Sequence, residues 1–280
     1  MPEGDTIFRS ARTLHRALAG STVTGFQTAY AQLASVDDQT PVKGRKIEKV
    51  ESRGKWLLVY FSGDLILVTH MLMSGSWHIY RRGERWQKSR AHMRIVIQTE
   101  KYEAIAFDVP VAQFHTQQSL ARHPAMTRLG QDLADSIFSH ADARARIRAE
   151  PEEEIGNALL NQRVVAGIGN VFKSEICFVC GINPFRTVSS LSDAQVSALL
   201  DASHQLMQAN IRENAAGDLV TCTGPRRTTR ANDPAARLWV YRRKGRECRR
   251  CGATILKRKQ GPGARSTYWC PQCQPTQAAE

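Results

Sequence analysis

Residues 247–274 read ECRRCGATILKRKQGPGARSTYWCPQCQ, and they decide the fold of the C-terminal part of the chain. Two C-x-x-C pairs, Cys248 with Cys251 and Cys270 with Cys273, are separated by 18 residues. This spacing is typical of a structural zinc site in which each pair occupies one tight turn. Four unrelated free cysteines would not be expected at such regular intervals. The stretch therefore predicts a β-hairpin held by one structural Zn²⁺, with four thiolate ligands and no open position for catalysis.

The remaining cysteines do not suggest a second metal site or a disulfide framework. The chain has an odd number of cysteines, seven, and in a reducing compartment paired C-x-x-C motifs favour metal over disulfides. Cys177 and Cys180 lie on a helical pattern with no second pair nearby. We interpret them as core packing.

The composition favours a polyanionic partner. The chain carries 39 Lys and Arg against 26 Asp and Glu, a formal net charge of +13, and a field of that sign attracts nucleic acid. A basic protein that is merely soluble is the alternative. Many of the cations belong to the predicted hairpin region: Arg242, Arg243, Arg246, Arg249, Arg250, Lys257, Arg258, Lys259 and Arg265. A solvated surface would explain most of them, but Arg265 lies near the glycines of the hairpin tip, where it can reach a phosphate.

Neither a membrane span nor a targeting segment is expected. No run of about 18 apolar residues occurs. The opening MPEGD has no basic segment followed by an apolar core. We therefore expect a cytoplasmic protein. A length of 280 residues is enough for two lobes.

The N-terminal part predicts a helix followed by an antiparallel sandwich. Ile7, Ala11, Leu14 and Leu18 recur at helical spacing, and Gly20 ends the pattern. From residue 21 to about 114 the sequence consists of short β-rich runs separated by turns. The clearest of these runs are WLLVYF at 56–61, LILVTHM at 65–71, MRIVIQT at 93–99 and AIAFDV at 104–109.

The second half is predicted to be helical until the cysteines. Pro and Gly punctuate 123–135, which we interpret as a linker. Asn170 and Ser192 are the expected N-caps of two of the helices, and 217–237 is a polar, basic stretch expected to be a mobile loop. The helical patterns cover 139–149, 152–161, 170–180 and 192–213.

The first residues offer a chemical group that few sequences have. Once Met1 is removed, Pro2 presents a secondary amine, and an α-amino pKa near 8 leaves a neutral fraction at neutral pH. Such an amine can attack a sugar C1′ and form an iminium that accepts electrons, with Glu3 beside it to move protons. Taken alone, the two residues could equally be an ordinary first helical turn.

Five stretches together resemble the formamidopyrimidine-DNA glycosylase and endonuclease VIII family, in the family's order and across nearly the whole chain. They are MPEGDTIFRSARTLHRAL at 1–18, SRGKWLLV at 52–59, HMLMSGSW at 70–77, LLNQRVVAGIGNVFKSEICFVCGINP at 159–184 and RSTYWCPQCQ at 265–274.

The resemblance implies an α+β multidomain fold: an N-terminal helix plus antiparallel β-sandwich, a helix-two-turn-helix domain and a C-terminal zinc-ribbon hairpin. DNA would bind in a cleft between the lobes. The corresponding ranges are 1–122 for the catalytic sandwich, 123–135 for the linker, 136–237 for the helical domain and 238–280 for the zinc ribbon.

The same resemblance implies the residues of the site. Pro2 is the Schiff-base nucleophile, Glu3 donates the proton for base loss, Lys55 serves β-elimination and Arg265 is associated with δ-elimination. By itself, Lys55 would be one exposed lysine before a strand. The expected product is a one-nucleotide gap with phosphates at both ends.

Residues expected to contact DNA extend beyond the reacting centre. Asn170 follows the glycine-rich turn VVAGIGN at 164–170, where backbone amides and the start of a helix favour a phosphate. Met73 matches the residue that fills the space left by a flipped nucleotide, although a core Met is the alternative. Arg128, Arg90, Arg163 and Lys173 complete the expected contacts. The partner is damaged double-stranded DNA, and a monomer is expected because one chain can enclose a kinked duplex in its own cleft.

One segment departs from the formamidopyrimidine branch. That branch typically has Asp-Pro-Arg-Arg-Phe-Gly after a late sandwich strand, whereas this chain has FDVPVAQF at 107–114. The opening MPEGDT favours the endonuclease VIII branch and oxidised pyrimidines, while Leu72, Met73 and Ser74 in the wedge loop are closer to the other branch.

Three hypotheses follow: a glycosylase/lyase for oxidised pyrimidines, the same chemistry on oxidised purines, and a non-catalytic zinc-ribbon DNA-binding protein. Pro2, Glu3 and Lys55 argue against the third, because binding alone needs none of them.

Overall fold

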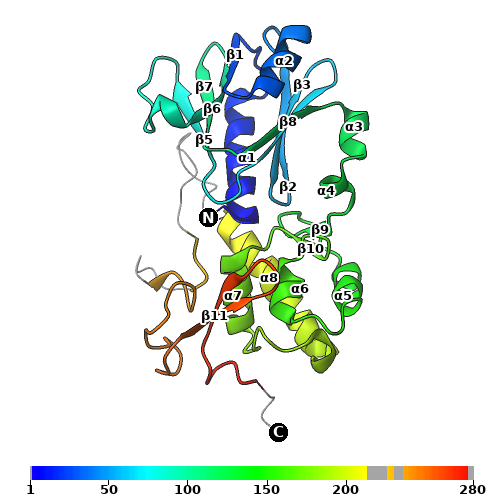
Figure 1. Cartoon of the computed structure of the whole chain (residues 1–280), viewed down its shortest axis with the longest axis vertical. Helices are drawn as coiled ribbons and strands as arrows, with labels where there is room; N and C mark the ends of the chain where they lie inside the picture. The colour runs from blue at the N-terminus through cyan, green and yellow to red at the C-terminus, as the bar shows by residue number, and fades with distance from the viewer. Residues whose placement is uncertain (1, 213–225, 230–235, 277–280) are drawn as a thin grey trace. The chain divides into compact units, whose positions relative to one another are not determined.

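The computed structural model describes residues 2–212, 226–229 and 236–276, and they divide into two compact units (Figure 1). Unit 1 contains the described residues up to Arg128, and unit 2 contains those from Leu129 onward. The boundary falls inside the predicted linker 123–135. Most of the expected loop 217–237 lies outside the described residues. No helix in the described part of the chain is both long and apolar enough to cross a membrane.

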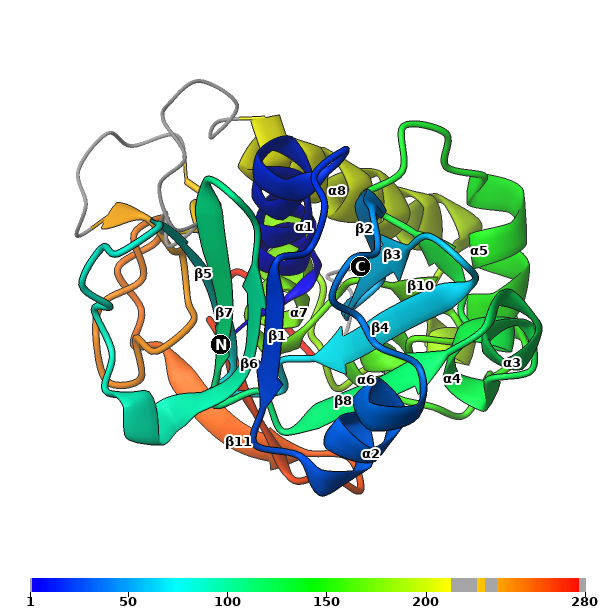
Figure 2. The ribbon, with the colours of Figure 1, turned by 90° about the horizontal axis from the view of Figure 1, so that it is seen from above.

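The predicted N-terminal helix is confirmed as α1 (Gly4–Leu18). Its stripe of Ile7, Leu14 and Leu18 is buried, and Gly20, with φ 84°, turns the chain away after it. Figures 1 and 2 show α1 running between two sheets. The helix therefore forms the middle of the unit 1 core.

Two four-stranded antiparallel sheets enclose α1 and confirm the predicted sandwich. One sheet has the order β1 (Gly25–Thr28), β6 (Met93–Gln98), β7 (Tyr102–Phe107) and β5 (Ser76–Arg81). The other has the order β2 (Ile47–Arg53), β3 (Trp56–Phe61), β4 (Leu65–His70) and β8 (Val111–His115). Around them lie α2 (Ala31–Gln39), the 3₁₀ turn η1 (Arg90–His92), α3 (Gln117–Ala121) and α4 (Pro124–Thr127).

The apolar runs of the sequence are explained by burial on both faces of the sheets. In β3, Leu57 and Val59 face the core with α1, whereas Leu58 and Tyr60 join an outer cluster with Leu120 of α3. Side chains alternate between the faces of a strand, so a strand covered on both sides must be apolar throughout.

Unit 2 contains the helices that the sequence predicted. They are α5 (His140–Arg148), α6 (Ile155–Leu160), α7 (Asn170–Val179) and α8 (Asp193–Arg212), with the 3₁₀ turn η2 (Val188–Ser190) and the parallel pair β9 (Gln131–Asp132) and β10 (Val165–Ala166). The Ser192 N-cap is confirmed, because its hydroxyl accepts the Gln195 N–H at 3.2 Å. The Asn170 N-cap is wrong: Gly169 caps α7, and Asn170 is its first helical residue.

The predicted hairpin consists of β11 (Leu256–Gln260) and β12 (Arg265–Trp269), joined by residues 261–264. It packs on α7, whose Ser174 hydroxyl accepts the Tyr268 N–H at 3.4 Å. The hairpin and the helices therefore share one compact unit.

A buried carboxylate on α7 organises the chain that leads into the hairpin. Glu175 is fully buried, and its two oxygens accept the N–H groups of Trp239, Val240 and Tyr241 at 2.7, 2.9 and 2.8 Å. The Thr228 hydroxyl donates to the same carboxylate. Buried amides need such acceptors, so one side chain satisfies a segment that has no ladder partner there.

We expect Glu175→Gln to lower the free energy of unfolding by about 2 kcal/mol, because one acceptor oxygen becomes an N–H₂ group facing backbone donors. Urea denaturation checks this, with the exposed Glu152→Gln as the matched control. Equal stabilities for the two variants would contradict the anchoring role.

Candidate active site and metal centre

The start of the chain is held rigidly immediately behind Pro2. Pro2 is half-buried, and Glu3 is fully buried at the N-cap of α1. The Glu3 carbonyl accepts the N–H groups of Thr6 and Ile7, each at 3.0 Å. A terminal amine on Pro2 would therefore be attached to backbone that the start of α1 holds in place.

Lys55 lies in the two-residue turn between β2 and β3. Arg53 pairs with Trp56 across the ladder, leaving only Gly54 and Lys55 in the turn. Gly54 has φ 58°, the conformation that a tight hairpin turn reserves for glycine. The sequence thus fixes the position of Lys55 through the glycine before it.

Chain direction brings the N-terminus and Lys55 to the same end of unit 1. The Gly20 N–H donates to Ile47 O and the Val50 N–H donates to His15 Nδ1, so α1 runs antiparallel to β2. From His15 back to Glu3 the helix spans about 18 Å at roughly 1.5 Å per residue, and from Val50 to Lys55 the strand spans about 17 Å at roughly 3.3 Å per residue. Both stretches therefore end at nearly the same level.

His70 lies at this end as well, and the sequence analysis did not assign it a role. It pairs across the ladder with Trp56, whose ring centroid is 4.7 Å away. Burial, and then the positive charge of Lys55, lower the pKa of His70 from 6.5 to about 4. The ring is thus neutral, and its Nδ1 accepts the Leu72 N–H at 3.0 Å. In the sequence, the only hint of a special role for His70 was its position as a polar residue at the end of an apolar strand.

The loop after His70 exposes two large apolar side chains. Leu72 is 48% exposed and Met73 is 66% exposed, and Leu72 has φ 45°. The Gly75 N–H closes the turn on Met71 O at 2.9 Å. A Cβ on Gly75 would lie 2.7 Å from Met71 O and 3.1 Å from Val109 Cα. The placement of Met73 fits a wedge and does not fit the alternative of a core methionine.

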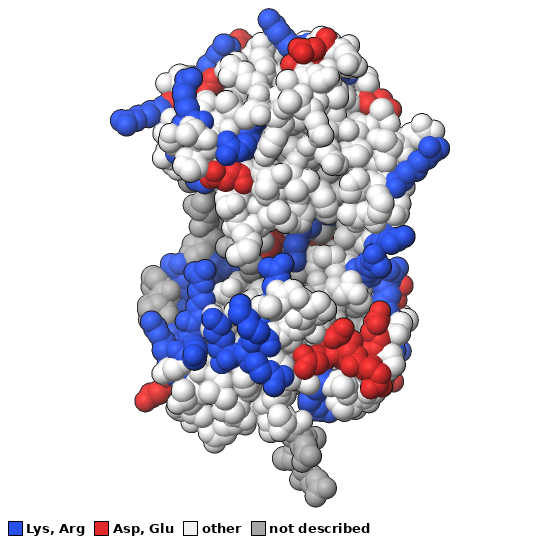
Figure 3. Space-filling model, viewed as in Figure 1, with Lys and Arg blue, Asp and Glu red and all other residues white. Residues whose placement is uncertain are grey.

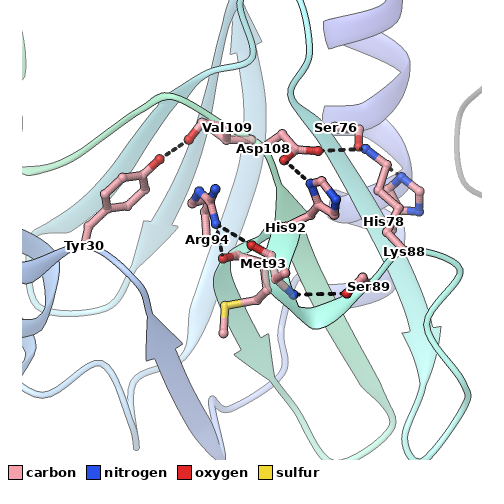
Figure 4. Close-up of polar contacts among 11 residues, drawn as sticks. Tyr30, Ser76, His78, Lys88, Ser89, His92, Met93, Arg94, Asp108 and Val109 are labelled. Carbon is pink, nitrogen blue, oxygen red and sulfur yellow. Dashed lines mark hydrogen bonds and ion pairs between the residues drawn. The ribbon is translucent and has the colours of Figure 1, made fainter.

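The segment that departs from the formamidopyrimidine branch is a short, fixed turn between β7 and β8 (Figure 4). Asp108, with φ 51°, accepts from His92 Nδ1 at 2.7 Å and from Lys88 Nζ at 3.3 Å. The His92 hydrogen bond is the main cause that lowers the Asp108 pKa. The Tyr30 hydroxyl donates to Val109 O in the same turn.

Asn170 and Arg265 come together in unit 2. Asn170 Nδ2 donates to Ser266 O at 2.6 Å, which ties the start of α7 to the residue beside Arg265. Arg265 is exposed, at the first position of β12. Figure 3 shows Lys and Arg side chains gathered over the part of unit 2 that carries this hairpin. A helix N-terminus beside such cations suits a phosphate.

Lys173 requires a correction. The sequence proposed it as a phosphate contact, but its side chain is fully buried. Its Nζ donates to Thr267 Oγ1 at 2.5 Å and to Gln260 Oε1 at 3.2 Å. Lys173 lies three residues after Asn170, which suggested a shared role, but the hairpin residues Gln260 and Thr267 cover its side chain.

The other predicted arginines are exposed and lie apart along the chain. Arg90 stacks over Trp86 at 5.1 Å in unit 1, and Arg128 follows α4. Arg163, in unit 2, precedes β10, and its carbonyl accepts from Arg146 at 3.0 Å. All three side chains are accessible to a phosphate, and their contact with DNA stays a prediction.

The four cysteines of the two C-x-x-C pairs form one cluster. Their sulfur atoms all lie within 4.8 Å of one another, with Cys248 and Cys273 at 3.9 Å and Cys251 and Cys270 at 3.4 Å. Tetrahedral Zn–S bonds of about 2.3 Å place sulfurs about 3.8 Å apart, so the cluster fits zinc. Cys177 on α7 is fully buried and Cys180, the C-cap of α7, is half-buried; neither belongs to the four-cysteine cluster.

The fold and this site define a protein with an N-terminal sandwich, a helical unit and a basic zinc-ribbon hairpin. Models of three domains match the chain: the formamidopyrimidine-DNA glycosylase N-terminal domain at residues 1–111, the H2TH domain at 129–220, and the zinc finger found in FPG and IleRS at 245–276. The chain belongs to the formamidopyrimidine-DNA glycosylase and endonuclease VIII family.

Individual relatives agree with this assignment. "Probable endonuclease 8 2" of Streptomyces coelicolor is 37% identical over 98% of this chain and 94% of the relative. "DNA-(apurinic or apyrimidinic site) lyase Nei2" of Mycolicibacterium smegmatis is 36% identical, covering 98% and 99%. The structure of Lactococcus lactis Fpg with DNA containing an abasic site matches with a TM-score of 0.82, at 22% identity, over 98% of this chain and 100% of that one. At that identity the structural likeness shows the fold.

We expect one zinc per chain in the purified protein, and Cys270→Ser to lose most of it, because three remaining thiolates leave the coordination incomplete. Metal analysis by mass spectrometry measures the content, with the buried, non-cluster Cys177→Ala as the control. Full zinc retention in Cys270→Ser would contradict the four-cysteine site.

His70 should make stability depend on pH. Because its folded pKa, about 4, lies below its ordinary 6.5, the unfolded chain binds more protons between these values. The stabilisation is present above about pH 6.5 and is lost as the pH falls toward 4. We expect the stability difference between the parent protein and His70→Gln to shrink by up to about 2 kcal/mol between pH 7 and 4.5, measured by urea denaturation at constant ionic strength. A difference that does not change with pH would contradict this.

Proposed function

We propose that the protein is a bifunctional DNA glycosylase and AP lyase of base excision repair that removes oxidised bases, preferentially pyrimidines, from duplex DNA. One observation carries the proposal: Pro2, which becomes the terminus once Met1 is removed, is followed by the buried Glu3 and lies at the same end of unit 1 as the Lys55 turn. A DNA-binding module has no use for a rigid terminal amine. Family membership supports the same activity.

The reaction follows from the amine. The Pro2 nitrogen attacks the sugar C1′ and loses its proton; the bond between C1′ and the base breaks, and the base leaves with a proton from Glu3. The C1′–O4′ bond then breaks as O4′ takes up a proton from solvent, which opens the sugar ring and leaves an iminium between C1′ and the nitrogen. The iminium keeps its positive charge because the nitrogen has no proton to lose. That charge acidifies the C2′–H bond.

The strand is then cut twice. Loss of the C2′ proton to solvent sends the electron pair into a new double bond, and the C3′–O bond breaks with its phosphate as leaving group. Loss of the C4′ proton likewise breaks the C5′–O bond. Water hydrolyses the remaining iminium to an aldehyde and frees Pro2. Lys55 would assist the first elimination and Arg265 the second, each cation stabilising a departing phosphate.

Binding would use both units. Asn170, Arg265 and the exposed Arg90, Arg128 and Arg163 would contact phosphates, and Met73 would fill the space left by the flipped nucleotide. Lys173, being buried, is left out of this set.

An enzyme that works on the chromosome would act in the cytoplasm, at the nucleoid. One chain would suffice, since no symmetric partner is needed to supply these residues.

Two features favour oxidised pyrimidines. The relative from Streptomyces coelicolor is named a probable endonuclease 8, which is the branch that the opening MPEGDT favours. The segment 107–114, FDVPVAQF, lacks the Arg-Arg-Phe run with which the formamidopyrimidine branch fills the void and contacts the orphan base. Oxidised purines are the second candidate, supported by Met73 in the wedge loop.

Borohydride should trap the protein covalently on duplexes with an abasic site or dihydrouracil, and several-fold less on 8-oxoguanine opposite cytosine, because the amine attacks only a sugar that the site accepts. Denaturing gels measure the adduct. Pro2→Gly should reduce trapping strongly, and a chain extended at its N-terminus should abolish it, since its nitrogen is an amide. Binding of all three duplexes without an adduct would point to a non-catalytic DNA-binding protein, and more adduct on 8-oxoguanine would point to the purine branch.

A further inference from the structure

Lys173 is a fully buried lysine on a helix that otherwise packs largely through apolar side chains. Its ammonium donates to Thr267 Oγ1 at 2.5 Å and Gln260 Oε1 at 3.2 Å. Thr267 Oγ1 also donates to Gln260 Oε1 at 2.7 Å, so the three groups form one network. Burying an ammonium costs free energy that an aliphatic side chain of the same length avoids. Such a group calls for a role beyond filling space.

The partners of Lys173 flank Arg265 on both strands of the hairpin. Gln260 is the residue that pairs with Arg265 across the ladder, and Thr267 lies two residues further along β12. Ser266, which lies between Arg265 and Thr267, accepts from Asn170 through its carbonyl oxygen. The first turn of α7 therefore contacts the two residues that follow Arg265 and the residue that pairs with Arg265 across the ladder.

The network continues to the other side of the hairpin and limits its movement further. Gln260 Nε2 donates to Glu154 Oε2 and to Pro184 O, each at 2.8 Å. A Cβ on Gly261 would lie 2.5 Å from Asn157 Oδ1, so the turn that precedes Arg265 lies directly against α6. Through Gln260, Lys173 connects α6, α7 and both strands.

We propose that Lys173 is a positioning residue that holds Arg265 where its guanidinium meets the phosphate departing in the second elimination. This rests on the function proposed above. In that step the C4′–H electron pair becomes the C4′–C5′ double bond, the proton goes to solvent, and the C5′–O pair leaves with the phosphate. Stabilisation of that charge depends on placement, because a shift of about 1 Å in a charged group costs on the order of tenfold to a hundredfold in rate.

The test separates the two eliminations. Single-turnover reactions use a labelled duplex with an abasic site formed beforehand, and gels resolve the β-product, a 3′ unsaturated aldehyde, from the δ-product, a 3′ phosphate. We expect Lys173→Met and Thr267→Val to slow δ-elimination about tenfold, with borohydride trapping and β-elimination within about twofold of the parent protein. Thr267→Ser, which keeps the hydroxyl, should restore the δ rate.

A double-mutant cycle asks whether Lys173 acts through Arg265. If it does, Lys173→Met adds nothing to the loss in δ rate caused by Arg265→Ala. Additive losses, or equal loss of both eliminations, would overturn the proposal. Zinc content and thermal unfolding identify variants that merely misfold, and if Lys173→Met is one of these, the Thr267→Val and Thr267→Ser pair decides. A parent protein that forms no trapped adduct would instead sink the proposed function itself.

Discussion

The burial of α7 on several sides is the constraint on which the second unit depends. Its Asn170 and Lys173 face the hairpin, and Glu175 faces the segment that leads into the hairpin. A helix enclosed in this way cannot shift without breaking several buried hydrogen bonds at once, each costing about 1–3 kcal/mol if left unmade. Zinc fixes the far end of the same hairpin. The start of α7 and the zinc ribbon are therefore fixed to the same hairpin.

In the first unit the corresponding constraint is the direction of α1. A helix that begins at Gly4 and is enclosed by two sheets has little freedom to slide, so the position of Pro2 follows from the packing of Ile7, Leu14 and Leu18. If the proposed nucleophile lay on a loop, it would need other contacts to hold it. Here the core itself supplies them, and the tight turn at Gly54 does the same for Lys55.

Local patterns predicted the elements well, and long-range contacts explain where prediction stopped. The spacing of the cysteines, the stripe on α1 and the apolar runs of β3 and β4 depend on neighbours in sequence, so they were readable. The burial of Lys173 depends on Gln260 and Thr267, about 90 residues away, and no local signal marks it. The same holds for His70, whose low pKa comes from packing around its strand end.

Net charge is a weaker guide to DNA contacts than the sequence suggests. Within unit 2, Arg250 stacks on Phe178 at 4.5 Å, Arg258 lies 3.6 Å from the ring of Phe185, and Arg243 donates to Glu247 O at 2.6 Å. Cations held by the protein lose part of their freedom to follow a phosphate backbone, and Lys173 has lost all access to it. Each phosphate contact contributes about 0.9 to the slope of log K against log salt concentration, so the salt dependence of duplex binding would count the cations that reach phosphates, which the formal charge of +13 does not. The basic residues of the ribbon thus divide into those that build the hairpin and those, such as Arg265, that it presents.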